Sequence, residues 1–327
     1  MKVSSFDSER ASYLTLENKA GLSMTFCDLG ASIYEMRLDD VPMNIAPKDL
    51  SEFETTRAYY GKTIGRISGR IPNGEIKVAG KACRMSLTEG NNAHHGGKSS
   101  WAFVRFQTHL EEKEGKTILT YSYHSPDGEE TIPGAIDFQT IYEIEEEEAS
   151  FRVIFHARSD QETVLAPILH PYFNLGEEDI LHHRLTLRAS QYYEMNHEMV
   201  PTKLVPVTPL LDFRKGKEIG LGVDDPIFDG IPPYGYDHIY LLDHEENKPD
   251  AILENERFRL EVSTEMPCLL IYSDNFGDGK LLNNGFHEKK HAALAIEASE
   301  HPAAARFEPL KANQDYTRIS EYRFFRK

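Results

Sequence analysis

The stretch IDFQTIYEIEEEEASFRVIF, residues 136–155, decides the fold class of this chain. Ile136, Phe138 and Ile144 alternate with polar residues before an acidic run at 146–148, and Phe151 and Val153 alternate with polar or smaller residues after it. Such alternation places successive side chains on opposite faces of a strand. The stretch therefore predicts a long β-hairpin, with the acidic run as its solvated tip rather than a cation site.

The same alternation recurs through the chain. We expect further strands within residues 22–38 (two strands with a turn at 28–30), 75–78, 184–188, 258–263, 266–273, 292–299 and 321–325. Ser51 and Glu54 have the spacing of a helix capping box, but Gly61 follows so closely that only a short helix fits. These patterns predict an all-β fold with few short helices. At 327 residues the chain could hold two domains, although β-sandwiches often exceed the usual domain size as single units.

The composition bounds the partners and the compartment. The formal net charge of −17 argues against nucleic acid and against anionic membranes, because both require clustered Lys and Arg, and it favours a neutral or weakly polar ligand. Cys27, Cys83 and Cys268 are odd in number and widely spaced, which predicts no disulfide framework. The first ten residues lack the apolar run of a signal peptide, and no later run is long enough to cross a bilayer. We therefore expect a soluble, cytoplasmic protein.

A glycine-punctuated segment at residues 61–79 carries Arg66 and Arg70. It lacks the lysine and hydroxyl that follow the last glycine of a phosphate-binding loop. We expect its glycines to bring both arginines toward a shared surface, with a turn at 72–74 leading into a strand. A surface salt bridge is the alternative role for either arginine.

Two adjacent histidines, His94 and His95, lie in a polar loop at residues 91–97. Because neighbouring side chains on an extended strand point to opposite faces, the pair is poorly placed to bind one metal. We expect at most one of them to face a cleft.

The heptapeptide at residues 170–176, HPYFNLG, joins an imidazole to a Pro, two aromatic rings, an amide and a turn-forming Gly. This composition suits the wall of a cleft, and His170 can exchange protons near neutral pH. Taken alone, a histidine that is simply satisfied in the core or in a turn is the more common explanation.

Two carboxylates lie at the ends of apolar runs. Asp237 precedes an apolar strand and follows a Pro- and Gly-rich segment at 224–236, which we expect to fold over a cleft as a loop. Glu297 ends the run at 292–296, where burial would raise its pKa and make it a candidate base. The alternatives are a loop-capping role for Asp237 and a solvent-facing Glu297.

Taken together and in this order, residues 65–71, 91–97, 170–176, 236–242, 272–276, 296–297 and 322–324 resemble the aldose 1-epimerase, or galactose mutarotase, family. The resemblance spans nearly the whole chain and implies one domain over residues 1–327, a large antiparallel β-sandwich with a sugar cleft on its concave face. It further implies that His170 is the general acid, Glu297 the general base, and Arg70, His95 and Asp237 the sugar-binding residues. The implied reaction interconverts the α and β anomers of a free aldose such as galactose or glucose, and needs neither a metal nor an organic cofactor.

The chain departs from the family pattern beside the base. Ser299 stands where the family often has Gln, and residues 301–304 read His-Pro-Ala-Ala where Pro-Asp-Ala is usual. Both departures bear on which sugar is preferred. Three alternatives remain open: a glycosidase using Asp237 and Glu297 as its carboxylate pair, a non-catalytic carbohydrate-binding protein, and a hexose-phosphate epimerase. Either a monomer or a homodimer is compatible with the sequence.

Overall fold

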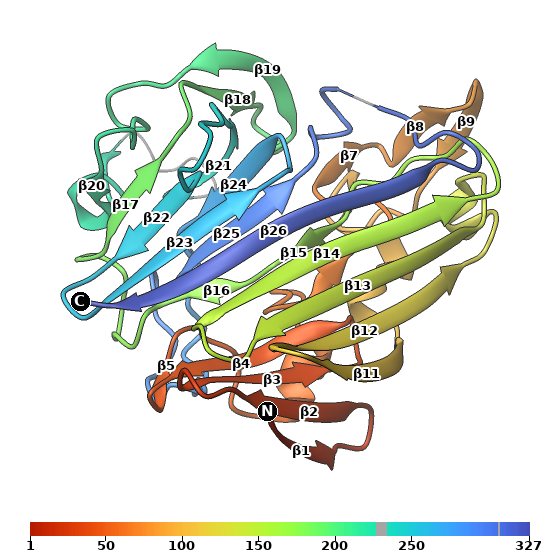
Figure 1. Cartoon of the computed structure of the whole chain (residues 1–327). Helices are drawn as coiled ribbons and strands as arrows, with labels where there is room; N and C mark the ends of the chain where they lie inside the picture. Colours follow the sequence, from red (N-terminus) through yellow and green to blue (C-terminus); the bar gives the residue numbers. More distant parts are fainter. Residues whose placement is uncertain (227–233, 307) are drawn as a thin grey trace.

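A computed structural model describes residues 1–226, 234–306 and 308–327, and its architecture is built from antiparallel sheets. The largest sheet has nine strands in the spatial order β11 (Gln107–Lys113), β12 (Lys116–Ser125), β13 (Ile136–Glu145), β14 (Ser150–Ser159), β26 (Asp315–Arg326), β23 (Phe258–Thr264), β22 (Ala251–Glu254), β17 (Arg184–Leu187) and β20 (Lys217–Glu218). Its long strands run diagonally across the molecule (Figure 1). The all-β prediction is confirmed.

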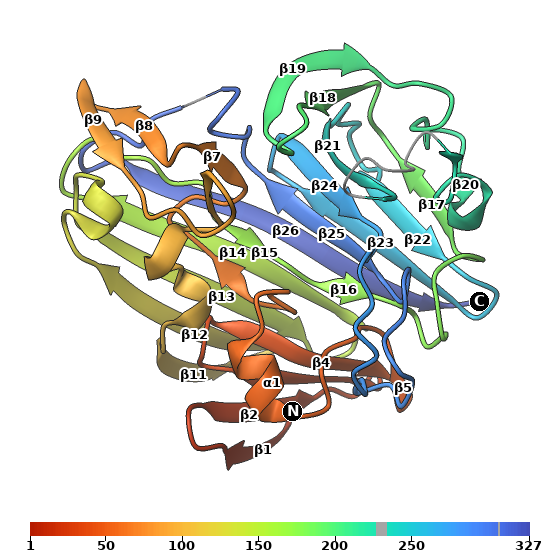
Figure 2. The same cartoon turned by 180° about the vertical axis from the view of Figure 1, so that it is seen from behind.

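Two further sheets complete the main body. A six-stranded sheet has the order β16 (Tyr172–Phe173), β25 (Leu294–Ser299), β24 (Cys268–Tyr272), β21 (Asp237–Leu241), β18 (Gln191–Met195) and β19 (Pro201–Pro206). A five-stranded N-terminal sheet runs β1 (Lys2–Asp7), β2 (Ser12–Glu17), β3 (Leu22–Cys27), β4 (Ser32–Leu38) and β5 (Val41–Pro42). In both views β18 and β19 lie at one end of the molecule and the N-terminal sheet at the other (Figures 1 and 2).

Short elements connect the large sheets. Three two-stranded sheets pair β6 (Thr63–Ile64) with β15 (Ile168–Leu169), β7 (Arg70–Pro72) with β10 (Asn92–His94), and β8 (Glu75–Val78) with β9 (Lys81–Arg84). Helix α1 (Leu50–Thr55) is as short as predicted, but its cap is not Ser51. The side chain of Asp49 caps the helix by accepting a hydrogen bond from the Ser51 backbone N–H, so the capping prediction was wrong by two residues.

The predicted hairpin is formed by β13 and β14, whose register pairs Ile144 with Phe151 around the acidic turn. The Nζ atom of Lys19 lies 3.1 Å from a Glu146 oxygen and 2.8 Å from a Glu147 oxygen. The carboxylates at the tip are thus partly neutralised by a lysine.

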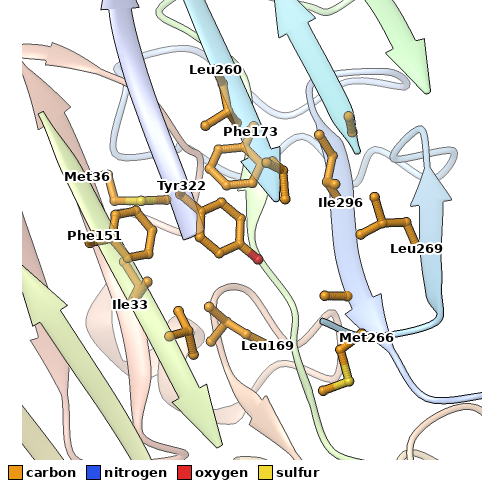
Figure 3. Close-up of a cluster of buried hydrophobic side chains, with 14 of the residues drawn as sticks. Ile33, Met36, Phe151, Leu169, Phe173, Leu260, Met266, Leu269, Ile296 and Tyr322 are labelled. Carbon is orange, nitrogen blue, oxygen red and sulfur yellow. The ribbon is translucent and has the colours of Figure 1, made fainter. Parts of the chain in front are cut away.

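The hydrophobic core lies where the three large sheets meet (Figure 3). Phe151 and Tyr322 come from the nine-stranded sheet, Leu269 and Ile296 from the six-stranded sheet, and Ile33 from the N-terminal sheet. All five side chains are buried, and the rings of Phe151 and Tyr322 stack with their centroids 4.9 Å apart. Burial of this kind is the main stabilising contribution to such a fold. The outward face of the six-stranded sheet is left to form the site.

Other expectations are settled more simply. All three cysteines are free and buried. In the part of the chain that the structure describes, no helix is long and apolar enough to cross a membrane. The loop expected at 224–236 falls largely on residues 227–233, which lie outside the described residues.

Candidate active site

The five predicted site residues come from distant parts of the chain and line one cavity of about 740 Å³. They are Arg70, His95, His170, Asp237 and Glu297. The cavity lies on the face of the six-stranded sheet opposite the core, and its volume suits a small-molecule ligand. The sequence therefore identified residues that the fold brings together.

Glu297 is positioned by strand alternation. All six residues of β25 are buried, and Ile296 points into the core between the sheets (Figure 3). Glu297 consequently faces the opposite side, the cavity, with only 1% of its surface exposed. The alternative of a solvent-facing Glu297 was wrong. Burial raises the pKa of this carboxyl well above its usual range, as expected from the sequence.

His170 is fixed through its backbone. Its N–H donates to the carbonyl of Lys62 at 3.0 Å, and its carbonyl accepts from the N–H of Gly61 at 2.8 Å. Gly61 has a φ of +61°, and a Cβ there would lie 1.8 Å from the carbonyl oxygen of Ile33, so this close approach requires glycine. These backbone bonds thus fix the position of residue 170 in the loop.

The two proposed proton-transfer groups are in contact. Nε2 of His170 lies 3.1 Å from Oε1 of Glu297. Among the described residues, the two carboxyl oxygens of Glu297 have no hydrogen-bond partner. The same holds for Nδ1 of His170. Burial lowers the pKa of His170 to about 3 while it raises that of Glu297. Since burial opposes charge on both groups, it favours a neutral imidazole beside a neutral carboxyl.

Arg70 and Asp237 flank this pair. The guanidinium of Arg70 binds Glu89 with two hydrogen bonds, Nε to Oε2 at 2.5 Å and Nη2 to Oε1 at 3.0 Å. Burial raises the pKa of Asp237 to about 6, and the charge of Arg70 opposes that rise. Glu89 was not identified from the sequence, although its position just before the histidine loop was the available signal. It orients Arg70 beside the cavity.

The prediction that at most one of His94 and His95 faces the cleft was wrong. Both line the cavity, with ring centroids 3.8 Å apart. His95 has a φ of +46°, so the chain leaves the extended conformation there and the alternation on which the prediction rested fails. Gly96 follows with a φ of +84°, and a Cβ on it would lie 2.1 Å from the carbonyl oxygen of Gly65.

His95 is a hydrogen-bond donor toward the cavity. Its Nδ1 accepts from the backbone N–H of Gly69 at 3.3 Å. Burial lowers the pKa of His95 well below its usual value, so the ring is neutral and its proton is on Nε2. The ring centroid lies 5.6 Å from that of His170.

Arg66 does not share the surface of Arg70, so that prediction was wrong. Arg66 is buried, with 3% of its surface exposed. Its guanidinium donates to the carbonyl of Gly134 at 2.9 Å and to the hydroxyl of Ser125. These contacts tie the glycine-rich loop to the segment that follows β12, which is a structural role.

The arrangement can move protons on a polar ligand. A carboxyl group and an imidazole in contact provide a base and an acid, His95 donates hydrogen bonds, and Asp237 accepts them. Across the described ranges, no cluster of three His, Cys, Asp or Glu side chains has the arrangement of metal ligands.

Comparison with known proteins identifies the family. The family model described as aldose 1-epimerase matches residues 12–322. The aldose 1-epimerase of Haemophilus influenzae is 26% identical over 332 residues, covering 95% of this chain and 95% of the relative. The galactose mutarotase of Homo sapiens is 28% identical over 302 residues, covering 88% of this chain and 84% of the human protein. The crystal structure of galactose 1-epimerase from Lactobacillus acidophilus has a TM-score of 0.90 and 25% identity, covering 100% of this chain and 99% of that one. The chain therefore belongs to the aldose 1-epimerase family.

Proposed function

We propose that this protein is an aldose 1-epimerase, an isomerase that interconverts the α and β anomers of a free aldose such as galactose or glucose. The observation that carries the proposal is the contact between His170 and Glu297, two buried groups that face the cavity. Family membership supports the same reaction.

The reaction needs one acid and one base. Glu297, in its ionised form, removes the proton of the anomeric hydroxyl while His170 protonates the ring oxygen. The bond between the anomeric carbon and the ring oxygen breaks, and the hemiacetal opens to the aldehyde. Rotation about the adjacent carbon–carbon bond presents the other face, and closure reverses the two roles.

The flanking residues orient the sugar. His95 and Arg70 donate hydrogen bonds to the ring oxygen and neighbouring hydroxyls, and Asp237 accepts one from a hydroxyl. Neither carboxyl oxygen of Glu297 has a hydrogen-bond partner among the described residues, so the hydrogen bond that favours its ionised form comes from the bound sugar.

The charge of the cavity favours a neutral sugar over a phosphorylated one. Among the described residues that line it, three are cationic and seven are carboxylic acids. The cationic set is Arg57, Arg70 and Lys280, and the acidic set is Glu89, Glu198, Asp237, Asp274, Asp278, Glu288 and Glu297. Arg70 is already bound to Glu89, and Lys280 is paired with acids of the cavity, so these two cations offer a phosphate dianion little attraction. The contact of Glu297 with an imidazole also differs from the two flanking carboxylates of a glycosidase.

Polarimetry tests the proposal. The wild-type protein should accelerate the mutarotation of freshly dissolved α-D-galactose or α-D-glucose, with turnover reduced by on the order of a hundredfold or more in Glu297→Gln and in His170→Asn. Glu112→Gln and His109→Asn, on exposed positions of β11, are matched controls that should keep wild-type rates. Near wild-type rates in both site variants would sink the assignment of the pair.

Two parallel assays separate the alternatives. A carbohydrate-binding protein would leave the mutarotation rate unchanged while binding sugar. Turnover of nitrophenyl glycosides would indicate a glycosidase, and a preference for glucose 6-phosphate over glucose would indicate a hexose-phosphate epimerase.

A further inference from the structure

The cavity extends beyond the catalytic pair to a second polar group. Tyr60, Asp274, Asp278, Lys280 and Glu288 line the same cavity, and the reaction described above assigns none of them a role. Most of their hydrogen-bonding capacity is already used within the group.

Glu288 and Lys280 form hydrogen bonds and ion pairs with each other and with neighbouring residues. The hydroxyl of Tyr60 donates to Oε1 of Glu288, and the backbone N–H of Asp278 donates to its Oε2 at 3.1 Å. Nζ of Lys280 lies 2.7 Å from an Asp278 oxygen and 3.3 Å from a Glu288 oxygen. These residues are therefore a bonded framework rather than open ligand-binding groups.

Asp274 is the exception. It is 3% exposed, and its Oδ2 has no hydrogen-bond partner within the described parts of the chain. A buried carboxyl without a partner is costly, and such groups in native structures call for an explanation. Burial and the neighbouring Glu288 together raise its pKa well above its usual value, which is the electrostatic signature of a carboxyl lacking donors.

The backbone holds Asp274 in a strained conformation. The residue follows β24 with a φ of +45°, a left-handed value uncommon for residues other than glycine. Its carbonyl accepts from the N–H of His291 at 2.7 Å, and the next residue, Asn275, donates its N–H to the hydroxyl of Tyr272 at 3.1 Å. Strain of this kind concentrates at ligand-binding positions.

Tyr172 links this group to the catalytic pair. Its ring centroid lies 5.0 Å from that of His170 and 4.7 Å from that of Tyr60. The charges of both Asp274 and Glu297 act on its hydroxyl. Tyr172 is therefore close to both acids, and Asp274 and Glu297 line the same cavity.

We propose that Asp274 is a specificity-determining residue whose carboxyl accepts a hydrogen bond from a hydroxyl of the aldose other than the anomeric one. This inference rests on the proposed function and deepens it. A site built to bind a substrate hydroxyl rejects the analogue that lacks it, because its own buried polar group is then left unpaired.

The test compares Asp274→Gly with the wild type on a panel of aldoses, each lacking one non-anomeric hydroxyl. Glycine removes the carboxyl and tolerates the positive φ, so the backbone is not strained further. The wild type should discriminate against one deoxy analogue by about tenfold or more in kcat/KM. Asp274→Gly should lose a similar factor on the parent sugar and nothing on that analogue, as in a double-mutant cycle.

Two more variants complete the design. Asp274→Asn retains an acceptor oxygen and should recover most of the discrimination, whereas Asp137→Gly, at an exposed position of β13, should not change it. An equal loss on every sugar in the panel, or a wild type that does not discriminate, would overturn the role of Asp274 while leaving the epimerase assignment intact.

Measuring the binding of the same panel by calorimetry separates a failure of the epimerase assignment from a failure of the role of Asp274. If the wild type turns over no aldose but binds the panel with discrimination that Asp274→Gly removes, the reaction assignment fails and the role of Asp274 stands. If it neither binds nor turns over any aldose, both proposals fail.

Discussion

Asp237 gives the proposed reaction a definite acid limit. Burial raises the pKa of its carboxyl to about 6, so the group loses its charge as the pH falls through that value. A protonated Asp237 accepts hydrogen bonds less strongly and no longer balances Arg70. We expect kcat/KM for mutarotation to fall below about pH 6, measured by polarimetry in buffers between pH 4.5 and 8 and corrected for the uncatalysed rate.

The Asp237→Asn variant is the control for the predicted fall of kcat/KM at acid pH. It should have a lower rate at pH 7.5 but no decline with a midpoint near 6, because the titrating group is gone. An unchanged midpoint in the variant would assign the fall of kcat/KM at acid pH to the coupled His170 and Glu297 pair instead.

At the level of single residues, the sequence named side chains that line one cavity but missed parts of their geometry. The resemblance to the family paired His170 with Glu297, and the structure has the two side chains in contact. His94 and Arg66 were misplaced, since strand alternation and glycine spacing do not reveal a residue with positive φ or a buried guanidinium. Asp274 was visible only as an acid at the end of an apolar strand, and its missing hydrogen bond depends on the folded environment.

At the level of elements, local alternation found the strands but not their partners. β13 and β14 are joined by a short turn, and their pairing followed from the sequence. β14 also pairs with β26, more than 150 residues further along the chain, as in the pairing of Phe151 with Tyr322. Contacts of that separation depend on the packing of whole sheets, which no local pattern encodes.

Lys62, in the loop before β6, destabilises the fold because its charged amine is buried, and a substitution can remove this effect. Its side chain is fully buried, its Nζ has no hydrogen-bond partner among the described residues, and it lies 4.6 Å from the ring centroid of Phe53 in α1. Burial lowers its pKa to about 8. Below pH 8 the amine is charged in both the folded and unfolded states, so the full cost of burying the charge opposes folding.

Lys62→Met should therefore raise the free energy of unfolding at pH 7 by about 1–4 kcal/mol, measured by urea denaturation. Between pH 8 and about 10 the unfolded chain binds more protons than the folded one, so wild-type stability gains from this group and the advantage of the variant shrinks. The backbone carbonyl of residue 62 that holds His170 is unaffected by the change. Lys77→Met, at an exposed position of β8, should have little effect. A less stable Lys62→Met at pH 7 would show that the contact with Phe53 outweighs the burial cost.

At the level of the whole molecule, we propose that residues 1–327 form one cooperative domain. The N-terminal sheet is joined to the nine-stranded sheet by buried contacts. The ring centroids of Phe26 in β3 and Tyr142 in β13 lie 4.8 Å apart, and the Tyr142 hydroxyl donates to the carbonyl of Ala31 at 2.6 Å. Leu269 and Ile296 of the six-stranded sheet belong to the same buried cluster. Because the three sheets share this buried cluster, we expect them to unfold together.

Thermal unfolding tests this unity directly. Trp101 is the one tryptophan of the chain, and its buried ring lies 4.5 Å from that of Phe138 in β13, so its fluorescence reports the nine-stranded sheet. Far-ultraviolet circular dichroism reports all three sheets. The two transitions should coincide, with a calorimetric enthalpy equal to the van't Hoff value. Ile33→Ala, in β4 of the N-terminal sheet, should destabilise the protein by about 2–5 kcal/mol and shift both probes by the same amount. If the variant moved the circular dichroism transition and left the Trp101 transition in place, the N-terminal sheet would be a separate unit. The backbone of His170, which bonds to Gly61 and through it to Ile33, would then be anchored across a boundary between domains.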